Sequence, residues 1–173
     1  KRFSPVTYGR DVKVSPTDPK TIYCALSVAA ASKDGGVYRS QDAGKTWKHV
    51  GLSDSRQIGR VRMHPKNPDV AYVAAMGHLW GPNKERGVFR TKDGGKTWQN
   101  ILFRSEKAGA FDLSFDAADP NTIYAAFWQV QRTPYSMISG GEGSSLYKST
   151  DGGDTWTDIS KNRGMPSGVL GKI

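Results

Sequence analysis

The sequence has few of the features that anchor or cross-link a chain. No apolar run approaches the roughly 20 residues that a membrane helix needs, so no membrane span is expected. The one cysteine, Cys24, excludes an internal disulfide. Its apolar, strand-like surroundings predict an inert core position rather than a reactive thiol. No signal peptide is recognisable and the first residue is Lys1, so we expect a processed, trimmed or partial protein.

Motifs for metals and cofactors are also missing. The Asp-x-Gly triplets lack the spacing and closing Glu of a calcium loop. Gly-Lys-Thr occurs at 44–46 and 95–97, but the earlier glycine of a phosphate loop is absent. The three histidines do not have the spacing of a zinc site: His49, His64 and His78. We therefore expect no metal and no cofactor.

The charge is strongly basic but dispersed. Lys and Arg number 25 against 16 Asp and Glu, which gives a net charge of +9. No dense basic cluster occurs, so a solvated basic surface is expected and no nucleic-acid partner. A hydrophobic share of 36% with 10% aromatic residues is typical of a globular chain.

An eight-residue pattern, Ser/Thr-x-Asp-x-Gly-x-Thr-Trp, occurs three times. It is a tight turn, here called the Asp-box turn, in which the carboxylate can accept backbone hydrogen bonds and the glycine can take positive φ. We expect the Thr hydroxyl to close the turn and the Trp ring to pack between sheets, a structural role. The repeated residues are Asp42, Gly44, Thr46 and Trp47, then Asp93, Gly95, Thr97 and Trp98, then Asp151, Gly153, Thr155 and Trp156.

The same elements recur around each turn. A β-type run precedes the turn at 36–39, 87–90 and 145–148, and an Asp/Asn-Pro pair lies further upstream between two more strands. This order predicts an all-β fold of four-stranded antiparallel β-propeller blades. The predicted boundaries are an edge strand or tail at 1–8, blades at 9–55, 56–107 and 108–167, and the start of a further blade at 168–173.

These turns resemble those of the BNR/Asp-box superfamily. The stretches 58–60, 77–83 and 132–135, with Trp128, are most similar to bacterial sortilin (Vps10)/xyloglucanase-like propeller proteins. The resemblance is specific for the fold, whereas the superfamily mixes enzymes with binding proteins. It implies that ligands bind on the face opposite the Asp-boxes, and it implies an extracytoplasmic location.

The long loops between the second and third strands are the expected ligand site. In an antiparallel blade these loops lie at the end opposite the Asp-box turn. Flat rings can stack on a sugar or a peptide, and arginine supplies forked donors, so a glycan or peptide ligand is expected. Simple packing of the loops is the other interpretation of the same residues. The candidate ligand-binding residues are His78, Trp80, Trp128, Arg132 and Tyr135, with Arg60 of a first strand.

Charged residues occupy one equivalent position in the first strands, which line the channel of a propeller. They are Asp11, Arg60 and Asp112, with Lys172 as a fourth equivalent. Asp11 and Asp112 are weak candidates for the carboxyl pair of a glycoside hydrolase, which must lie roughly 5 to 9.5 Å apart. A salt-bridge ring that includes Arg60 is the favoured interpretation. Asp34, before Gly35-Gly36, loosely resembles the catalytic Asp stretch of xyloglucanase-type enzymes.

Three blades are fewer than the four to eight of a closed propeller, and they leave exposed edges. A fragment or natural partial propeller, with self-association through these edges, is therefore expected. The alternatives are a ring completed by a second copy and a stand-alone arc in which residues 1–8 cover one edge. Two functions stay open from the sequence: a non-catalytic propeller module that binds a glycan or peptide, and a glycoside hydrolase of sialidase or xyloglucanase type, or part of one.

Overall fold

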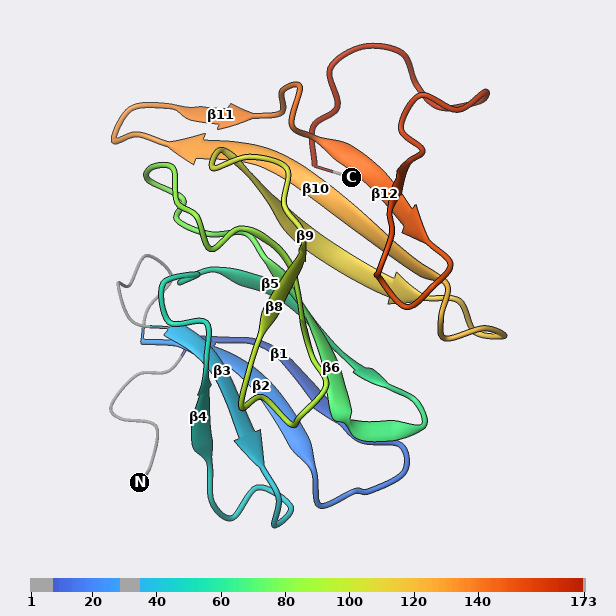
Figure 1. Cartoon of the computed structure of the whole chain (residues 1–173). Coiled ribbons are helices and arrows are strands. Elements are labelled where there is room, and N and C mark those ends of the chain that lie inside the picture. The colour runs from blue at the N-terminus through green and yellow to red at the C-terminus, as the bar shows by residue number, and fades with distance from the viewer. Residues whose placement is uncertain (1–7, 29–34, 173) are drawn as a thin grey trace.

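The fold consists of three antiparallel β-sheets that follow one another along the chain (Figure 1). The structure is a computed structural model that describes residues 8–28 and 35–172. Across these two ranges no helix is long and apolar enough to cross a membrane. The three antiparallel sheets confirm the all-β architecture of propeller blades that the sequence predicts.

The first two sheets have four strands each, in chain order, and the third has five. The first sheet holds β1 (Tyr8–Val14), β2 (Ile22–Ser27), β3 (Gly35–Ser40) and β4 (Lys48–Gly51). The second holds β5 (Ile58–His64), β6 (Asn67–Ala75), β7 (Gly87–Thr91) and β8 (Gln99–Leu102). The third holds β9 (Ala108–Phe115), β10 (Ile123–Arg132), β12 (Ser145–Ser149) and β13 (Thr157–Asp158), with β11 (Met137–Ser139) paired to the end of β10.

Two local expectations are corrected. The sequence predicts a loop for Trp128 and Arg132, but both lie on β10, which continues to Arg132 and pairs with β11 as a hairpin. The run Phe127-Trp128-Gln129-Val130 has high strand propensity and extends the strand. Pro68 lies inside β6 rather than in a turn, because β5 and β6 already pair from His64 and Asn67.

The first strands are equivalent in register as well as in sequence. Asp11 pairs with Ala25, Arg60 with Ala74, and Asp112 with Ala126. A β-bulge precedes each of these residues. Since β5 contacts both β1 and β9, the three charged residues are brought to adjoining strands, as in the inner ring of a propeller.

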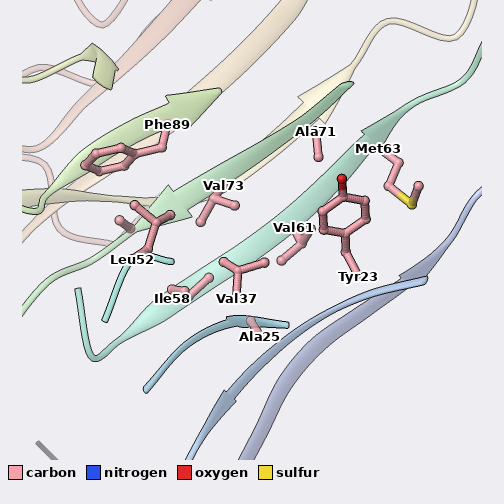
Figure 2. Packing of buried hydrophobic residues seen from close by; sticks show 11 residues of the cluster. Tyr23, Ala25, Val37, Leu52, Ile58, Val61, Met63, Ala71, Val73 and Phe89 are labelled. Carbon is pink, nitrogen blue, oxygen red and sulfur yellow. The ribbon is translucent and has the colours of Figure 1, made fainter. Parts of the chain in front are cut away.

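Two hydrophobic cores lie between successive sheets. Figure 2 shows the first, in which Tyr23, Ala25 and Val37 of the first sheet face Val61 and Val73 of the second. The second core joins the second and third sheets through Tyr72, Ala74, Val88, Leu113, Ile123, Ala125, Phe127 and Tyr147. Burying each large apolar side chain contributes about 1.5 to 3 kcal/mol, so contacts between the sheets carry much of the stability.

The sheets have two distinct ends. The Asp-box turns join the third strand to the fourth at one end. The loops between the second and third strands, and the links from one sheet to the next, lie at the other end. We call the latter the loop end.

Candidate functional site

The three Asp-box turns have the same hydrogen-bond pattern. Asp42 Oδ1 accepts from the backbone N of Thr46 at 2.8 Å, and Asp42 Oδ2 accepts from the Thr46 hydroxyl at 2.5 Å. Asp93 and Asp151 accept the same two bonds from Thr97 and Thr155. The Thr hydroxyl bond, followed by the backbone bond, lowers the pKa of Asp42 to about 2 and holds those of Asp93 and Asp151 well below their usual range.

The Asp-box tryptophans differ in what their indole N–H groups contact. Trp47 and Trp156 donate to carbonyls of their own turns, at Gly44 and Gly153. Trp98 instead donates to the Val50 carbonyl of β4 at 2.7 Å, which is in the first sheet. Trp98 therefore links the first and second sheets by a directional bond as well as by packing.

The charged first-strand residues form one ion-pair network. Arg60 donates to both oxygens of Asp112, from Nε at 2.7 Å and from Nη2 at 3.2 Å. Asp11, with 9% of its side chain exposed, accepts from the backbone N of Val61 at 2.9 Å. Arg62 lies between the two carboxylates, 3.5 Å from Asp11 and 3.9 Å from Asp112.

This network explains the ionisation of Asp112. Partial burial alone would raise the pKa of its carboxyl, but the hydrogen bond and charge of Arg60 outweigh burial and lower it. Arg62 was missed in the sequence, although it stands two residues from Arg60 and so on the same face of β5. Asp34 lies outside the described residues.

Lys172 has a different environment from the other first-strand charges. Its Nζ lies 4.0 Å from the ring centroid of Phe111 and 5.9 Å from that of Trp128. Trp128 also packs edge-on against Phe111, with 6.0 Å between ring centroids. Trp128 is therefore half-buried inside the third sheet's packing rather than displayed for a ligand.

The loop after β6 is held by polar contacts to the segments around it. His78 Nε2 lies 2.8 Å from the Asp54 carbonyl oxygen, and Asn83 Nδ2 donates to the same carbonyl at 3.1 Å. The almost fully buried Arg86 donates to the carbonyls of Lys107, His78 and Gly81. Burial lowers the pKa of Arg86 to about 10, so it stays charged at neutral pH. His78 and Arg86 thus fix the loop, and sequence alone gave no signal that Arg86 is buried.

Two aromatic rings project at the loop end, one from the loop after β6 and one from the β10–β11 hairpin. Trp80 is 52% exposed and Tyr135 is 98% exposed, at the tip of the β10–β11 hairpin. Arg132 donates its backbone N–H to the Leu79 carbonyl at 2.7 Å, which joins the two loops. Figure 1 shows the β10–β11 hairpin beside the loop that follows β6. Trp80, Tyr135 and the exposed Arg132 side chain therefore belong to adjoining segments of the loop end.

An open cavity of about 620 Å³ lies at the base of the same hairpin. Its charged lining residues are Arg104, Glu142, Asp158 and Lys161, and Met165 and Leu170 are among its apolar ones. Burial alone would raise the pKa of Asp158, but hydrogen bonds from the side chain and the backbone N of Ser160, together with the charges of Arg104 and Lys161, outweigh burial and lower it. None of these residues was predicted from the sequence. In the described part of the chain no cluster of His, Cys, Asp and Glu could hold a metal.

Sheets in series, Asp-box turns and adjoining first strands define an Asp-box β-propeller protein. The family model described as "Sortilin, neurotensin receptor 3" (Sortilin-Vps10) matches residues 35–165. The chain belongs to this family.

Relatives and solved structures extend the comparison. A protein of Neosartorya fischeri described as "Probable oligoxyloglucan-reducing end-specific xyloglucanase" is 28% identical over 160 residues, which are 86% of this chain and 17% of the relative. The Photosystem II assembly lipoprotein Ycf48 of Trichormus variabilis is 28% identical over 147 residues, 73% of this chain and 42% of the relative. The crystal structure of an ancestral GH74 enzyme superposes with a TM-score of 0.61 at 20% identity, over 87% of this chain and 18% of that one.

These matches differ in what they show. The solved structure, at 20% identity, shows the fold alone. The chain spans less than half of the length of both curated relatives. It is a set of propeller blades related to xyloglucanases and to sortilin-like proteins.

Proposed function

We propose that this chain binds a neutral carbohydrate at its loop end. The observation that carries the proposal is the pair of exposed rings on joined loops, Trp80 and Tyr135. A pyranose ring can stack its C–H face on each of them, and Arg132 supplies N–H donors for hydroxyl oxygens.

The cavity at the base of the hairpin supports a second contact region for the same ligand. The carboxylates of Glu142 and Asp158 would accept hydrogen bonds from sugar hydroxyls, and Arg104 would donate. Its volume of about 620 Å³ lies within the range of small-ligand sites. An oligosaccharide would then extend from the rings to the cavity.

Binding is favoured over hydrolysis because of how the predicted carboxylates are engaged. A glycoside hydrolase needs one carboxyl group that is protonated as a general acid. Asp112 has a lowered pKa beside Arg60, and Arg62 stands between Asp112 and Asp11. A glycoside hydrolase is the alternative function, and the observation in its favour is that one relative is named a xyloglucanase.

Calorimetric titration with soluble polysaccharides, beginning with xyloglucan, tests the proposal. Trp80→Ala and Tyr135→Ala should each weaken binding about tenfold, the equivalent of one lost stacking contact. The control is Val12→Ala. Val12 lies on the first sheet and is about as exposed as Trp80, and its substitution should leave carbohydrate binding unchanged. Binding that ignores both ring substitutions would contradict the site, and release of reducing sugar by the wild type would favour the hydrolase. Peptide binding that needs the same rings would replace the carbohydrate as ligand.

The proposed location is extracytoplasmic. It rests on the relatives, one of which is named a lipoprotein.

A further inference from the structure

The loop that carries Trp80 is closed at its base by one buried amide. This loop, here called the Trp80 loop, spans residues 76–86 between β6 and β7. Asn83 Oδ1 accepts a hydrogen bond from the backbone N of His78 at 3.2 Å, so residues 79–82 form a short arch above that contact. Asn83 is 7% exposed, whereas Trp80 within the arch is 52% exposed. The arch therefore displays an aromatic ring on a buried polar base.

The other polar atoms of Asn83 reach the segments on both sides of the second sheet. Its Nδ2 donates to the Asp54 carbonyl at 3.1 Å, and Asp54 lies in the link between the first and second sheets, residues 52–57. Its backbone N donates to the Glu106 carbonyl at 3.1 Å, and Glu106 lies in the link between the second and third sheets, residues 103–107. One residue thus joins the Trp80 loop to both of these links.

The link that receives the amide N–H has a strained and partly buried backbone. Leu52 and Arg56 have φ of +58° and +54°, a left-handed conformation that residues other than glycine rarely adopt. Ser55 is fully buried, and the Gln57 carbonyl accepts from two backbone N–H groups at the start of the Trp80 loop, at 2.8 and 3.2 Å. Strained conformations persist where the surrounding contacts fix them, and they are concentrated at functional sites. The Asp54 carbonyl is therefore a fixed acceptor.

Position 83 needs a side chain that donates and accepts at the same place. The amide of Asn83 accepts from the His78 N–H and donates to the Asp54 carbonyl. Aspartate has the same shape but no N–H donor, and alanine has neither group. The space beside the amide is also closed, because Gly77 has a φ of +74° and a Cβ on it would collide with Asn83 Oδ1. The backbone around the Trp80 loop is thus fitted to an amide at this position.

A ligand that stacks on two rings needs those rings at a fixed separation. Trp80 and Tyr135 come from different segments, which are joined where Arg132 N donates to the Leu79 carbonyl at 2.7 Å. That bond fixes the hairpin to the arch, and Asn83 fixes the arch to the sheets. An ordered ring lowers the entropy cost of binding, because the ligand does not have to immobilise it.

We propose that Asn83 is a positioning residue of the carbohydrate site, whose amide fixes the Trp80 loop so that the indole ring is ordered before a sugar binds. This role rests on the proposed function, because Trp80 belongs to that site. Asn83 is buried, so it acts through the loop rather than by touching the sugar. All of its contacts named above lie in described segments around the second sheet.

Fluorine NMR of the full chain labelled with fluorotryptophan tests this role without a ligand. The chain has five tryptophans, and Trp80→Phe identifies the signal of Trp80. In Asn83→Ala that signal should narrow and move toward the signal of free fluorotryptophan, because the ring gains freedom. The signal of Trp47, in an Asp-box turn, should stay where it is. A Trp80 ring as ordered in Asn83→Ala as in the wild type would overturn the proposal.

Calorimetric titration with xyloglucan measures the consequence for binding. Asn83→Ala should weaken binding about fivefold, because the ring and its loop must then be ordered at the moment of binding. Asn67→Ala is the matched control. It removes the acceptor of the Asp69 N–H at the Asp-box end of the same sheet, so the Trp80 signal and the affinity should not change. Equal losses of affinity in the two variants would show a general effect of stability and would overturn the proposal.

Asn83→Asp decides the matter if Asn83→Ala does not fold. It keeps the shape and the acceptor for the His78 N–H but has no donor for the Asp54 carbonyl, so Trp80 should again be mobile and binding weaker. Wild-type order of Trp80 and wild-type affinity in this variant would overturn the proposal. Failure of the proposed function is distinguishable, since the wild type would then bind no xyloglucan while the Trp80 signal still responded to Asn83→Ala.

Discussion

Arg60 holds both carboxylate oxygens of Asp112 across the boundary between the second and third sheets. The pair is two-pronged, so it fixes the relative position of β5 and β9 as well as neutralising charge. Arg62 adds a longer contact to the same carboxylate, 3.9 Å away.

The first prediction concerns this pair. Arg60→Leu and Asp112→Asn should each lower the free energy of unfolding by about 1 kcal/mol, a modest value because about a third of each side chain is exposed. Combined in one protein the losses should be less than additive, as urea unfolding of both single variants and the double variant would reveal. Arg163→Ala, at an exposed arginine, is the control. Strict additivity would mean that the pair contributes no coupling.

The second prediction concerns acid. A carboxyl whose folded pKa is depressed stabilises the fold above its unfolded pKa of about 3.9, and this contribution is lost as pH falls through the folded pKa. For Asp42 that window runs from about pH 4 down to about 2, and Asp93 and Asp151 shift the same way. Urea midpoints should therefore fall across this range. Thr46→Val removes the hydrogen bond that lowers the pKa of Asp42 most, so it should flatten the pH dependence of the urea midpoint. Thr157→Val on β13 should leave this pH dependence intact.

The third prediction concerns the tryptophan between the first and second sheets. Trp98→Phe leaves the Val50 carbonyl without its indole donor, whereas Trp156→Phe breaks a bond only within its own turn. Trp98→Phe should therefore cost about 1 kcal/mol more in the free energy of unfolding. Thermal denaturation of the two variants makes the comparison, and equal losses would show that the bond to Val50 adds nothing to packing.

The fourth prediction concerns Arg86, the buried arginine that holds the loop after β6. Arg86→Met leaves three carbonyls without their buried donor and should lower the free energy of unfolding by about 3 kcal/mol. At a temperature where the variant is still folded, it should also bind the proposed carbohydrate more weakly. The reason is that the loop carrying Trp80 would no longer be fixed by Arg86. Lys84→Met, on the exposed part of the same loop, is the matched control. Unchanged stability would contradict the buried role.

The fifth prediction concerns one backbone position. Ala43 has a φ of +59°, and the equivalent residues in the other turns, Gly94 and Gly152, have φ of +74° and +72°. Ala43→Gly should raise the free energy of unfolding by up to about 1 kcal/mol, because glycine adopts positive φ without strain. Gly94→Ala should do the reverse, since alanine is strained at this positive φ and its Cβ would displace the Arg39 guanidinium. Calorimetry on the two variants should give melting shifts of opposite sign.

The fold could be predicted because its signals are local and repeated. The residues Asp42, Gly44, Thr46 and Trp47 recur at a fixed spacing, and each performs a turn contact that needs only its own neighbours. Aligning the three repeats places Asp11, Arg60 and Asp112 at one equivalent position, and the strand pairing has the same register.

The site was less predictable because it depends on contacts between distant segments. The sequence predicts a loop position for both Trp80 and Trp128. In the structure the Trp80 side chain is exposed, whereas Trp128 lies on β10, which is longer than the sequence predicts, and packs on Phe111. The burial of Arg86 depends on the carbonyl of Lys107, 21 residues away. The cavity likewise needs Arg104 and the end of the chain to meet.

The two hydrophobic cores set an order of opening for the molecule. The second sheet is the only described sheet with apolar neighbours on both faces, so it cannot open without exposing both cores. The first and third sheets can each detach while the remaining pair keeps its core. Amide exchange should therefore be slowest in β6 and β7, and the chain would lose its sheets from the outside inward.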